Sequence, residues 1–239
     1  EREKLEWAVG SIISGDSKMI QKFVVLYGSA GSGKSTFLNI VQQLFDGYYA
    51  TFDAKALGSA SNSFALESFK DNPLIAIQND GDLSKIEDNT RLNSIVSHEQ
   101  LVINEKFTKT YAAKMNTFLF MGTNRPVRIT EAKSGLIRRL IDVHPSGRKV
   151  PFDRYQVLMG MIPFELGAIA SHCLEVYKGL GPNYYDGYVP KDMMSATNDF
   201  YDFVDNYFDE FNSREYTTLS DAWGLYKQYC EYAQVNYPL

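Results

Sequence analysis

The segment GSAGSGKST at residues 28–36 constrains this chain more than any other part of its sequence. It fits the pattern G-x-x-x-x-G-K-[ST], and the apolar run at residues 23–27 directly before it predicts a buried strand. Apolar residues at 38, 41 and 44 predict a helix that begins near Lys34. A glycine-rich loop between a strand and a helix lets backbone N–H groups surround a polyphosphate, and the helix dipole favours the negative charge. The sequence therefore predicts an α/β domain with a phosphate-binding loop.

This loop predicts that the chain binds the cofactors ATP and Mg²⁺. Lys34 is expected to reach the β- and γ-phosphates, and the Ser35 hydroxyl to bind Mg²⁺. The expected nucleotide-binding residues are the whole loop: Gly28, Ser29, Ala30, Gly31, Ser32, Gly33, Lys34, Ser35 and Thr36.

Polar residues follow two further predicted strands. Residues 74–78 lead into Asn79, Asp80, Gly81 and Asp82, and a carboxylate at such a strand end can bind Mg²⁺ and orient water. Asp80 is the first candidate for that role and Asp82 the second, although acidic residues are also common in plain turns. Residues 118–121 lead to Asn124, which is expected to contact the γ-phosphate or the attacking water, or else to form a turn.

An arginine pair follows Asn124. Arg139 lies fifteen residues after Asn124, and an arginine placed against the γ-phosphate of a neighbouring subunit neutralises transition-state charge. Arg138 is its substitute in this role. Arginines on an exposed helix are usually only solvated, so this assignment depends on the other motifs.

Strands that alternate with helices predict a mostly parallel sheet flanked by helices. Helices are expected over residues 1–14, 63–69, 83–97, 152–178 with a break at Pro163, 193–211 and 219–232, and a β-hairpin over residues 101–105 and 110–114. The expected divisions are residues 1–22, a motor core at 23–150, a helical extension at 151–182 and an acidic segment at 183–239.

The net charge of −5 is unevenly distributed. Residues 183–239 hold ten acidic and three basic side chains, a net of −7, so the rest of the chain has a net charge of +2. Residues 125–149 contain seven basic and two acidic side chains. The apolar runs are shorter than the ~18 residues of a membrane span, and the two cysteines lack pairing or metal spacing, which predicts a cytoplasmic protein without a membrane segment.

The order of these motifs resembles superfamily-3 helicases of the AAA+ class, over about residues 1–150. Residues 79–83 resemble the paired acids of that family, with Asn79 in place of the first acid, and residues 118–124 resemble its sensor motif. Residues 136–140 resemble its arginine-finger motif, and residues 101–109 its DNA-binding hairpin. The overall sequence pattern is similar to that of the helicase half of phage and poxvirus primase-helicases. Residues 215–239 are similar to the opening of an incomplete winged helix.

The resemblance implies a homo-oligomeric ring, a hexamer, with each ATP between two subunits. Hairpin residues Lys106 and Lys109 are then expected to follow the backbone of single-stranded DNA, with Phe107 against a base or sugar. The chain begins at Glu1 without a methionine, which predicts that it is a piece of a longer polypeptide. The resemblance also implies an upstream primase or polymerase domain in that polypeptide. The function expected is a DNA helicase motor of a phage replication protein. The alternatives are an ATP-dependent assembly or loading factor with weak hydrolysis and a P-loop kinase.

Overall fold

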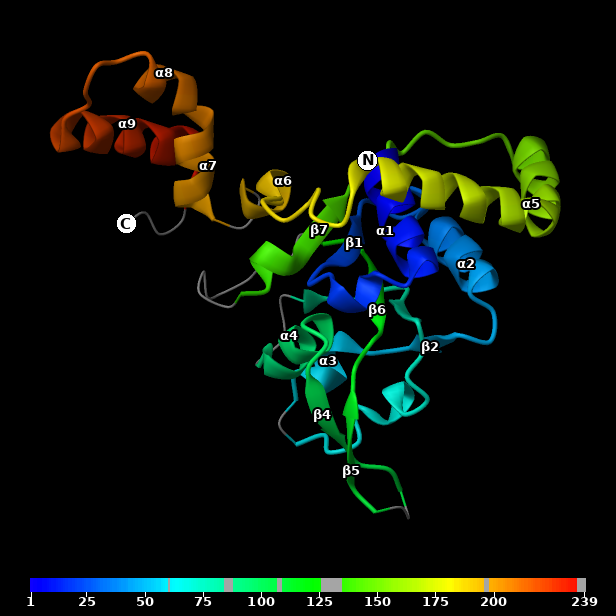
Figure 1. The fold of residues 1–239 in the computed structure, drawn as a ribbon. Coiled ribbons are helices and arrows are strands. Elements are labelled where there is room, and N and C mark those ends of the chain that lie inside the picture. Colours follow the sequence, from blue (N-terminus) through cyan, green and yellow to red (C-terminus); the bar gives the residue numbers. More distant parts are fainter. Residues whose placement is uncertain (60, 84–87, 107–108, 126–134, 196–197, 236–239) are drawn as a thin grey trace. The chain divides into compact units, whose positions relative to one another are not determined.

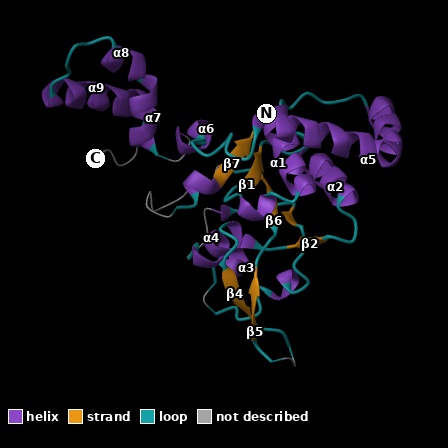
Figure 2. Cartoon of the chain, viewed as in Figure 1, coloured by secondary structure: helices purple, strands orange, loops and turns teal. Residues whose placement is uncertain are grey.

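The computed structural model describes residues 1–59, 61–83, 88–106, 109–125, 135–195 and 198–235. The chain divides into two compact units, residues 1–190 and residues 191–239, which we describe separately. Figure 1 labels the helices and strands, and Figure 2 shows them by type.

The first unit is built on a five-stranded sheet in which every paired strand is parallel to its neighbour. Its order is β2-β3-β6-β1-β7, so the strand that leads into the phosphate-binding loop lies between β6 and β7. The three inner strands are apolar runs because helices or loops cover both faces of a parallel sheet. The strands are β1 (Phe23–Tyr27), β2 (Tyr49–Thr51), β3 (Ile75–Gln78), β6 (Phe118–Thr123) and β7 (Leu140–Val143). The predicted fold class is confirmed.

Three helices pack beside this sheet: α1 (Arg2–Ser14), α2 (Lys34–Leu44) and α5 (Phe152–Leu180). Together with β1, β3, β6 and β7 they form the main hydrophobic core, which includes Trp7, Leu38 and Phe120. Helix α1 approaches α5 so closely that a Cβ atom on Gly10 would lie 2.1 Å from the carbonyl oxygen of Cys173. This crossing therefore requires glycine at position 10.

Helix α5 is one helix of 29 residues, so Pro163 does not end it as expected, although Figure 1 shows that α5 changes direction along its length. Proline removes one backbone hydrogen bond from a helix, but this part of α5 is exposed, and water can satisfy the released carbonyl group. Phe164 is 90% exposed, whereas Cys173 and Tyr177 in the second half are buried against the core. By length and composition alone, α5 is also long and apolar enough to cross a membrane, a property that was not predicted from the sequence.

A two-stranded antiparallel hairpin, β4 (Gln100–Ile103) and β5 (Tyr111–Lys114), confirms the predicted one. In Figure 1 it extends away from α1, α2 and α5. The expected helix at 63–69 is reduced to a 3-10 turn, η2 (Glu67–Phe69), and the one at 83–97 to α4 (Thr90–Val96), with residues 84–87 outside the described residues. Two smaller elements before β3 are η1 (Ser17–Met19) and α3 (Ala54–Leu57).

The second unit is helical. The single helix expected at 193–211 is wrong, because the chain forms α6 (Lys191–Ser195), α7 (Asp199–Asn206) and α8 (Phe208–Asn212) there. Asn198 interrupts it: its backbone is extended, and its side chain accepts a hydrogen bond from the backbone N–H of Tyr201, which starts a new helix. Helix α9 (Leu219–Tyr232) confirms the prediction for 219–232 and packs Tyr226 and Tyr229 against Phe203.

Candidate functional site

The phosphate-binding loop joins β1 to α2, as its sequence predicts. Gly31 and Gly33 have positive φ angles of 77° and 97°, which L side chains rarely adopt. Lys34 is the first residue of α2 and is only 7% exposed. Its Nζ donates hydrogen bonds to the carbonyl oxygens of Gly28, at 2.7 Å, and Ser29, at 2.9 Å. The loop therefore holds its own lysine in place.

The third partner of Lys34 is Asn124. Nζ of Lys34 lies 2.7 Å from Oδ1 of Asn124, which follows strand β6 next to β1. Burial lowers the pKa of Lys34, and the charge of Asp80 opposes that shift. The structure thus brings Lys34, Asn124 and Asp80 together, and these are three of the residues that the motifs single out.

Asp80 is exposed on the turn that follows β3. This turn lies directly against β6: the N–H of Gly81 donates to the carbonyl oxygen of Gly122 at 2.8 Å. A Cβ atom on Gly122 would lie 2.6 Å from the carbonyl oxygen of Asn79. Gly122 therefore allows the turn that carries Asp80 to approach the strand that carries Asn124.

The second acidic candidate, Asp82, forms an ion pair with Arg125, with 3.8 Å between Oδ2 and Nη1. This pairing favours Asp80 over Asp82 as the acid that faces the nucleotide. Among the described residues no group of three or more His, Cys, Asp or Glu side chains could hold a metal ion by itself. Mg²⁺ keeps several waters and is bound by one or two protein ligands together with nucleotide phosphates. Ser35, exposed at the start of α2, and Asp80 suit that role.

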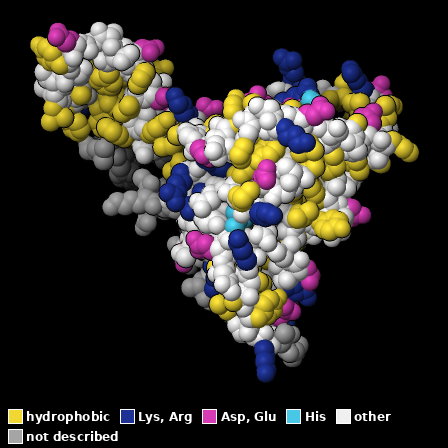
Figure 3. All heavy atoms as spheres, viewed as in Figure 1, with side chains coloured by type: hydrophobic (Ala, Val, Ile, Leu, Met, Phe, Trp, Pro, Cys, Tyr) yellow, Lys and Arg dark blue, Asp and Glu magenta, His cyan; other side chains and the backbone are white. Residues whose placement is uncertain are grey.

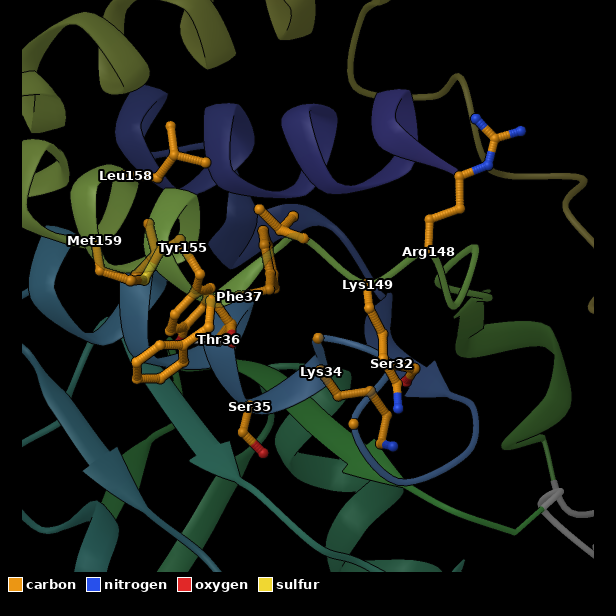
Figure 4. A pocket seen from close by; sticks show the side chains of 15 residues that line it. Ser32, Lys34, Ser35, Thr36, Phe37, Arg148, Lys149, Tyr155, Leu158 and Met159 are labelled. Atoms are coloured by element: carbon orange, nitrogen blue, oxygen red, sulfur yellow. Dashed lines mark hydrogen bonds between the residues drawn. The ribbon is translucent and has the colours of Figure 1, made fainter.

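A pocket of about 640 Å³ opens beside the loop, between the start of α2 and the start of α5. Figure 4 shows Lys149 extended toward Ser32 and Lys34, and Arg148 turned away from them. Thr36 and Tyr155 both line this pocket, and their hydroxyl groups lie 3.3 Å apart, within hydrogen-bond distance. The remaining wall is mainly apolar: Phe37, Ile40, Val150, Phe152, Leu158 and Met159. This gives a nucleotide a cationic end for phosphates and an aromatic and aliphatic end for a base.

The sequence motifs did not predict this second wall. Lys149 belongs to the basic stretch at residues 125–149, which was the only signal available. Phe152 and Tyr155 gave no signal, because aromatic residues in an amphipathic helix usually belong to a core.

The arginine pair lies at the opposite end of the sheet from the loop. Leu140, directly after the pair, is in register with Phe23, the first residue of β1, and the loop starts five residues later. At ~3.3 Å per residue this separates the two ends by about 16 Å, more than an arginine side chain spans. The pair therefore cannot serve the nucleotide of its own chain.

The two arginines differ in their surroundings. They belong to a 3-10 turn, η4 (Ile137–Arg139), not to a helix with solvated arginines. Arg139 is 8% exposed, and its guanidinium donates to Oγ of Ser97, at 2.8 and 3.1 Å, and to the carbonyl oxygen of Gly135, at 2.8 Å. Arg138 is exposed. Arg139 is thus engaged within its own chain, and Arg138 is the member of the pair that faces outward.

The expected DNA-binding residues lie at the far end of the hairpin. Lys106 and Lys109 are exposed, and Phe107 lies outside the described residues. Figure 3 shows basic side chains near this end of the molecule. The hairpin is thus a projecting basic element, remote from the phosphate-binding loop.

Comparison with known proteins supports the fold. The profile of a family of unknown function, DUF5906, matches residues 26–139. Two apo structures of the NrS-1 C-terminal region, one of residues 305–718 and one an A form, align with TM-scores of 0.53 at 16% and 14% identity. Each alignment covers 95% of this chain and 57% of that one, so the chain spans little more than half the length of these structures. A candidate ATPase from Cytophaga hutchinsonii aligns with a TM-score of 0.37 at 12% identity, over 75% of this chain and 58% of that one. The first two alignments show that the chain shares its α/β fold with the NrS-1 C-terminal region.

Proposed function

We propose that the chain is an ATP-driven motor that moves single-stranded DNA through a homo-oligomeric ring, most simply a hexamer, in the helicase part of a phage replication protein. The hydrolysis site is the loop Gly28–Thr36 with Asp80 and Asn124, and the DNA contacts are Lys106, Phe107 and Lys109. The motor would act in the cytoplasm, and an upstream primase or polymerase domain would belong to the same polypeptide. Two features support the proposal: the contact between Lys34 and Asn124, and the distance of the arginine pair from its own loop.

The chemistry follows from the positions of these groups. Phosphoryl transfer depends on positioning and on neutralising charge, because little covalent chemistry falls to the protein. When ATP binds, Lys34 exchanges its carbonyl partners for phosphate oxygens, and Lys149 adds a second positive charge from the other wall. Asp80 orients the attacking water and Asn124 contacts the γ-phosphate. Mg²⁺, held by Ser35 and Asp80, would supply neutralisation between the phosphates when bound.

The observation that carries the proposal is the placement of Arg138. It is exposed, and the sheet separates it from the loop of its own chain by about 16 Å. If such an arginine contacts a nucleotide, that nucleotide belongs to a neighbouring subunit, and a ring provides this arrangement. A P-loop kinase needs its arginines over its own nucleotide, so this placement favours the ring over that alternative.

The test is steady-state ATP hydrolysis with and without single-stranded DNA, with Arg138→Ala beside the parent protein. We expect DNA to stimulate turnover, and Arg138→Ala to reduce it about 10³-fold or more, the usual contribution of an arginine finger. Nucleotide affinity is expected to stay within about threefold. Arg2→Ala, which removes an exposed arginine from α1, is the control for lost charge. Turnover that ignores DNA and survives Arg138→Ala would overturn the proposal.

One observation favours a second function. Asn79 occupies the position where related motors have an acid, so the site has one fewer carboxylate to activate water. An ATP-dependent loading or assembly factor that binds ATP but hydrolyses it slowly fits this difference. Native mass spectrometry with and without ATP, combined with the turnover measurement, separates the two. Rings with negligible turnover support the loading factor, and rings with DNA-stimulated turnover support the motor.

A further inference from the structure

Three segments far apart in the sequence meet at the base of the β4–β5 hairpin. They are residues 97–99 after α4, residues 20–22 before β1, and the turn η4 that carries the arginine pair. Their contacts are mostly polar; those of His98 are buried, and those of Lys22 and Arg139 are part-buried. We call this junction the hairpin root, and it consists of Ser97, His98, Lys22, Arg138 and Arg139.

The first contact of the hairpin root joins Ser97 to Arg139. Oγ of Ser97 accepts from both Nε and Nη2 of the guanidinium, at 3.1 and 2.8 Å. Ser97 ends helix α4, and strand β4 begins three residues later at Gln100. A displacement of the hairpin stem therefore acts on Arg139 through one side chain. The guanidinium is a planar fork, so these paired bonds fix its orientation as well as its distance.

The second contact ties both stems of the hairpin to the chain before β1. The ring nitrogens of His98 lie 2.8 Å from the carbonyl oxygen of Ile20 and 3.2 Å from that of Met115, which directly follows β5. Met115 also donates its N–H to the carbonyl oxygen of Glu99 at 3.1 Å. The two stems are thus joined to each other where they reach the root.

The third contact holds the backbone of the exposed arginine. Nζ of Lys22, a residue only 6% exposed, donates to the carbonyl oxygen of Arg138 at 2.6 Å. Arg138 is therefore fixed on two sides, by Lys22 at its own carbonyl and by Ser97 through the next side chain. Lys22 directly precedes β1, the strand that ends at the phosphate-binding loop.

We propose that Ser97 is a positioning residue that couples the hairpin to the arginine turn, so that a load on the hairpin changes the position of Arg138 at the neighbouring subunit. The idea rests on the proposed function for its consequence in turnover, but the coupling itself is a property of a single chain. Arg139 then has a role within its own subunit, which explains why it is buried and fully engaged.

The test compares Ser97→Ala with Ser97→Thr, which keeps a hydroxyl, and with Ser94→Ala, which removes a hydroxyl from the same helix one turn earlier. We expect Ser97→Ala to reduce the ratio of turnover with DNA to turnover without it at least fivefold. Turnover without DNA is expected to change less than twofold. Affinity for DNA is expected to change less than threefold. Ser97→Thr restores the ratio, and Ser94→Ala leaves it unchanged.

Amide hydrogen exchange tests the coupling without ATP or DNA. Ser97→Ala should accelerate exchange both at residues 97–103 and at residues 137–140, whereas Ser94→Ala should leave residues 137–140 as they are. Faster exchange confined to residues 97–103 would refute the coupling. An absence of DNA stimulation in the parent protein, with exchange still spreading to residues 137–140, would instead refute the motor function and leave the coupling in place.

Discussion

Replacing Gly122 by alanine tests how the site is assembled. The new Cβ atom would lie 2.6 Å from the carbonyl oxygen of Asn79, while ordinary van der Waals contact begins at 3.4 Å, so the turn must shift by about 0.8 Å. Asp80 follows Asn79 directly and moves with it. Misplacement of a catalytic group by about 1 Å can reduce a rate about 10²-fold. The same crowding should cost about 1–3 kcal/mol of stability, as overpacking does in other cores.

The measurements are a coupled ATPase assay, titration with a fluorescent ATP analogue and thermal unfolding. Turnover should fall about 30- to 100-fold. The dissociation constant should change less than about threefold, because the loop and Lys34 are not displaced. The melting temperature should fall by about 2–12 °C, since 1 kcal/mol shifts a chain of this size by about 2–4 °C.

The control is Gly167→Ala in α5, where a Cβ atom would have no atom within 4 Å. It should leave turnover unchanged and not lower the melting temperature. Two results would refute the reasoning: Gly122→Ala with parental turnover and stability, or a loss of nucleotide binding as severe as that of Lys34→Ala.

Three further predictions follow from the described contacts. Lys149→Ala should raise the dissociation constant for ATP about tenfold, the equivalent of 1.4 kcal/mol, with Arg148→Ala as control; equal effects of the two would mean that Lys149 does not face the phosphates. Gly10→Val should lower the urea midpoint or prevent folding, because its Cβ meets the carbonyl oxygen of Cys173 at 2.1 Å; an unchanged midpoint would contradict this packing. Burial lowers the pKa of His98, so the unfolded chain binds more protons there and the free energy of unfolding should fall as pH drops below about 6.5; an NMR titration midpoint of His98 at or above that value would contradict this.

Local patterns predicted the parts of the molecule that depend on neighbouring residues. The loop at residues 28–36, its strand and its helix form as expected because the glycines, the apolar run and the lysine are contiguous. The β4–β5 hairpin was predicted for the same reason. Asn124 was predicted from its place after a strand, and its contact with Lys34 follows because parallel strands end at one edge of the sheet.

Features that depend on distant contacts were not predictable in this way. Arg139 reads as a surface residue, but Ser97, 42 residues away, provides the partner that allows its burial. Lys149 and Tyr155 reach the pocket only because β7 returns the chain beside β1. Pro163 was read as a break, since the sequence does not show that this part of α5 is exposed.

Under the proposed function, the direction of β1 and β7 also constrains how copies of this chain associate. One end of the sheet carries the phosphate-binding loop and the other carries Arg138, so a contact that joins them brings together two unlike surfaces. A contact of this heterologous kind leaves an unused surface at each end of every assembly, unless a constant rotation per subunit brings the last copy back to the first. A two-fold dimer could supply Arg138 to both nucleotides only if the loop and Arg138 reached the same interface. A Lys34→Ala subunit should still supply Arg138 to its neighbour, and an Arg138→Ala subunit should still bind ATP. Mixing these two inactive proteins should therefore restore turnover at the fraction of subunit contacts that join one variant to the other.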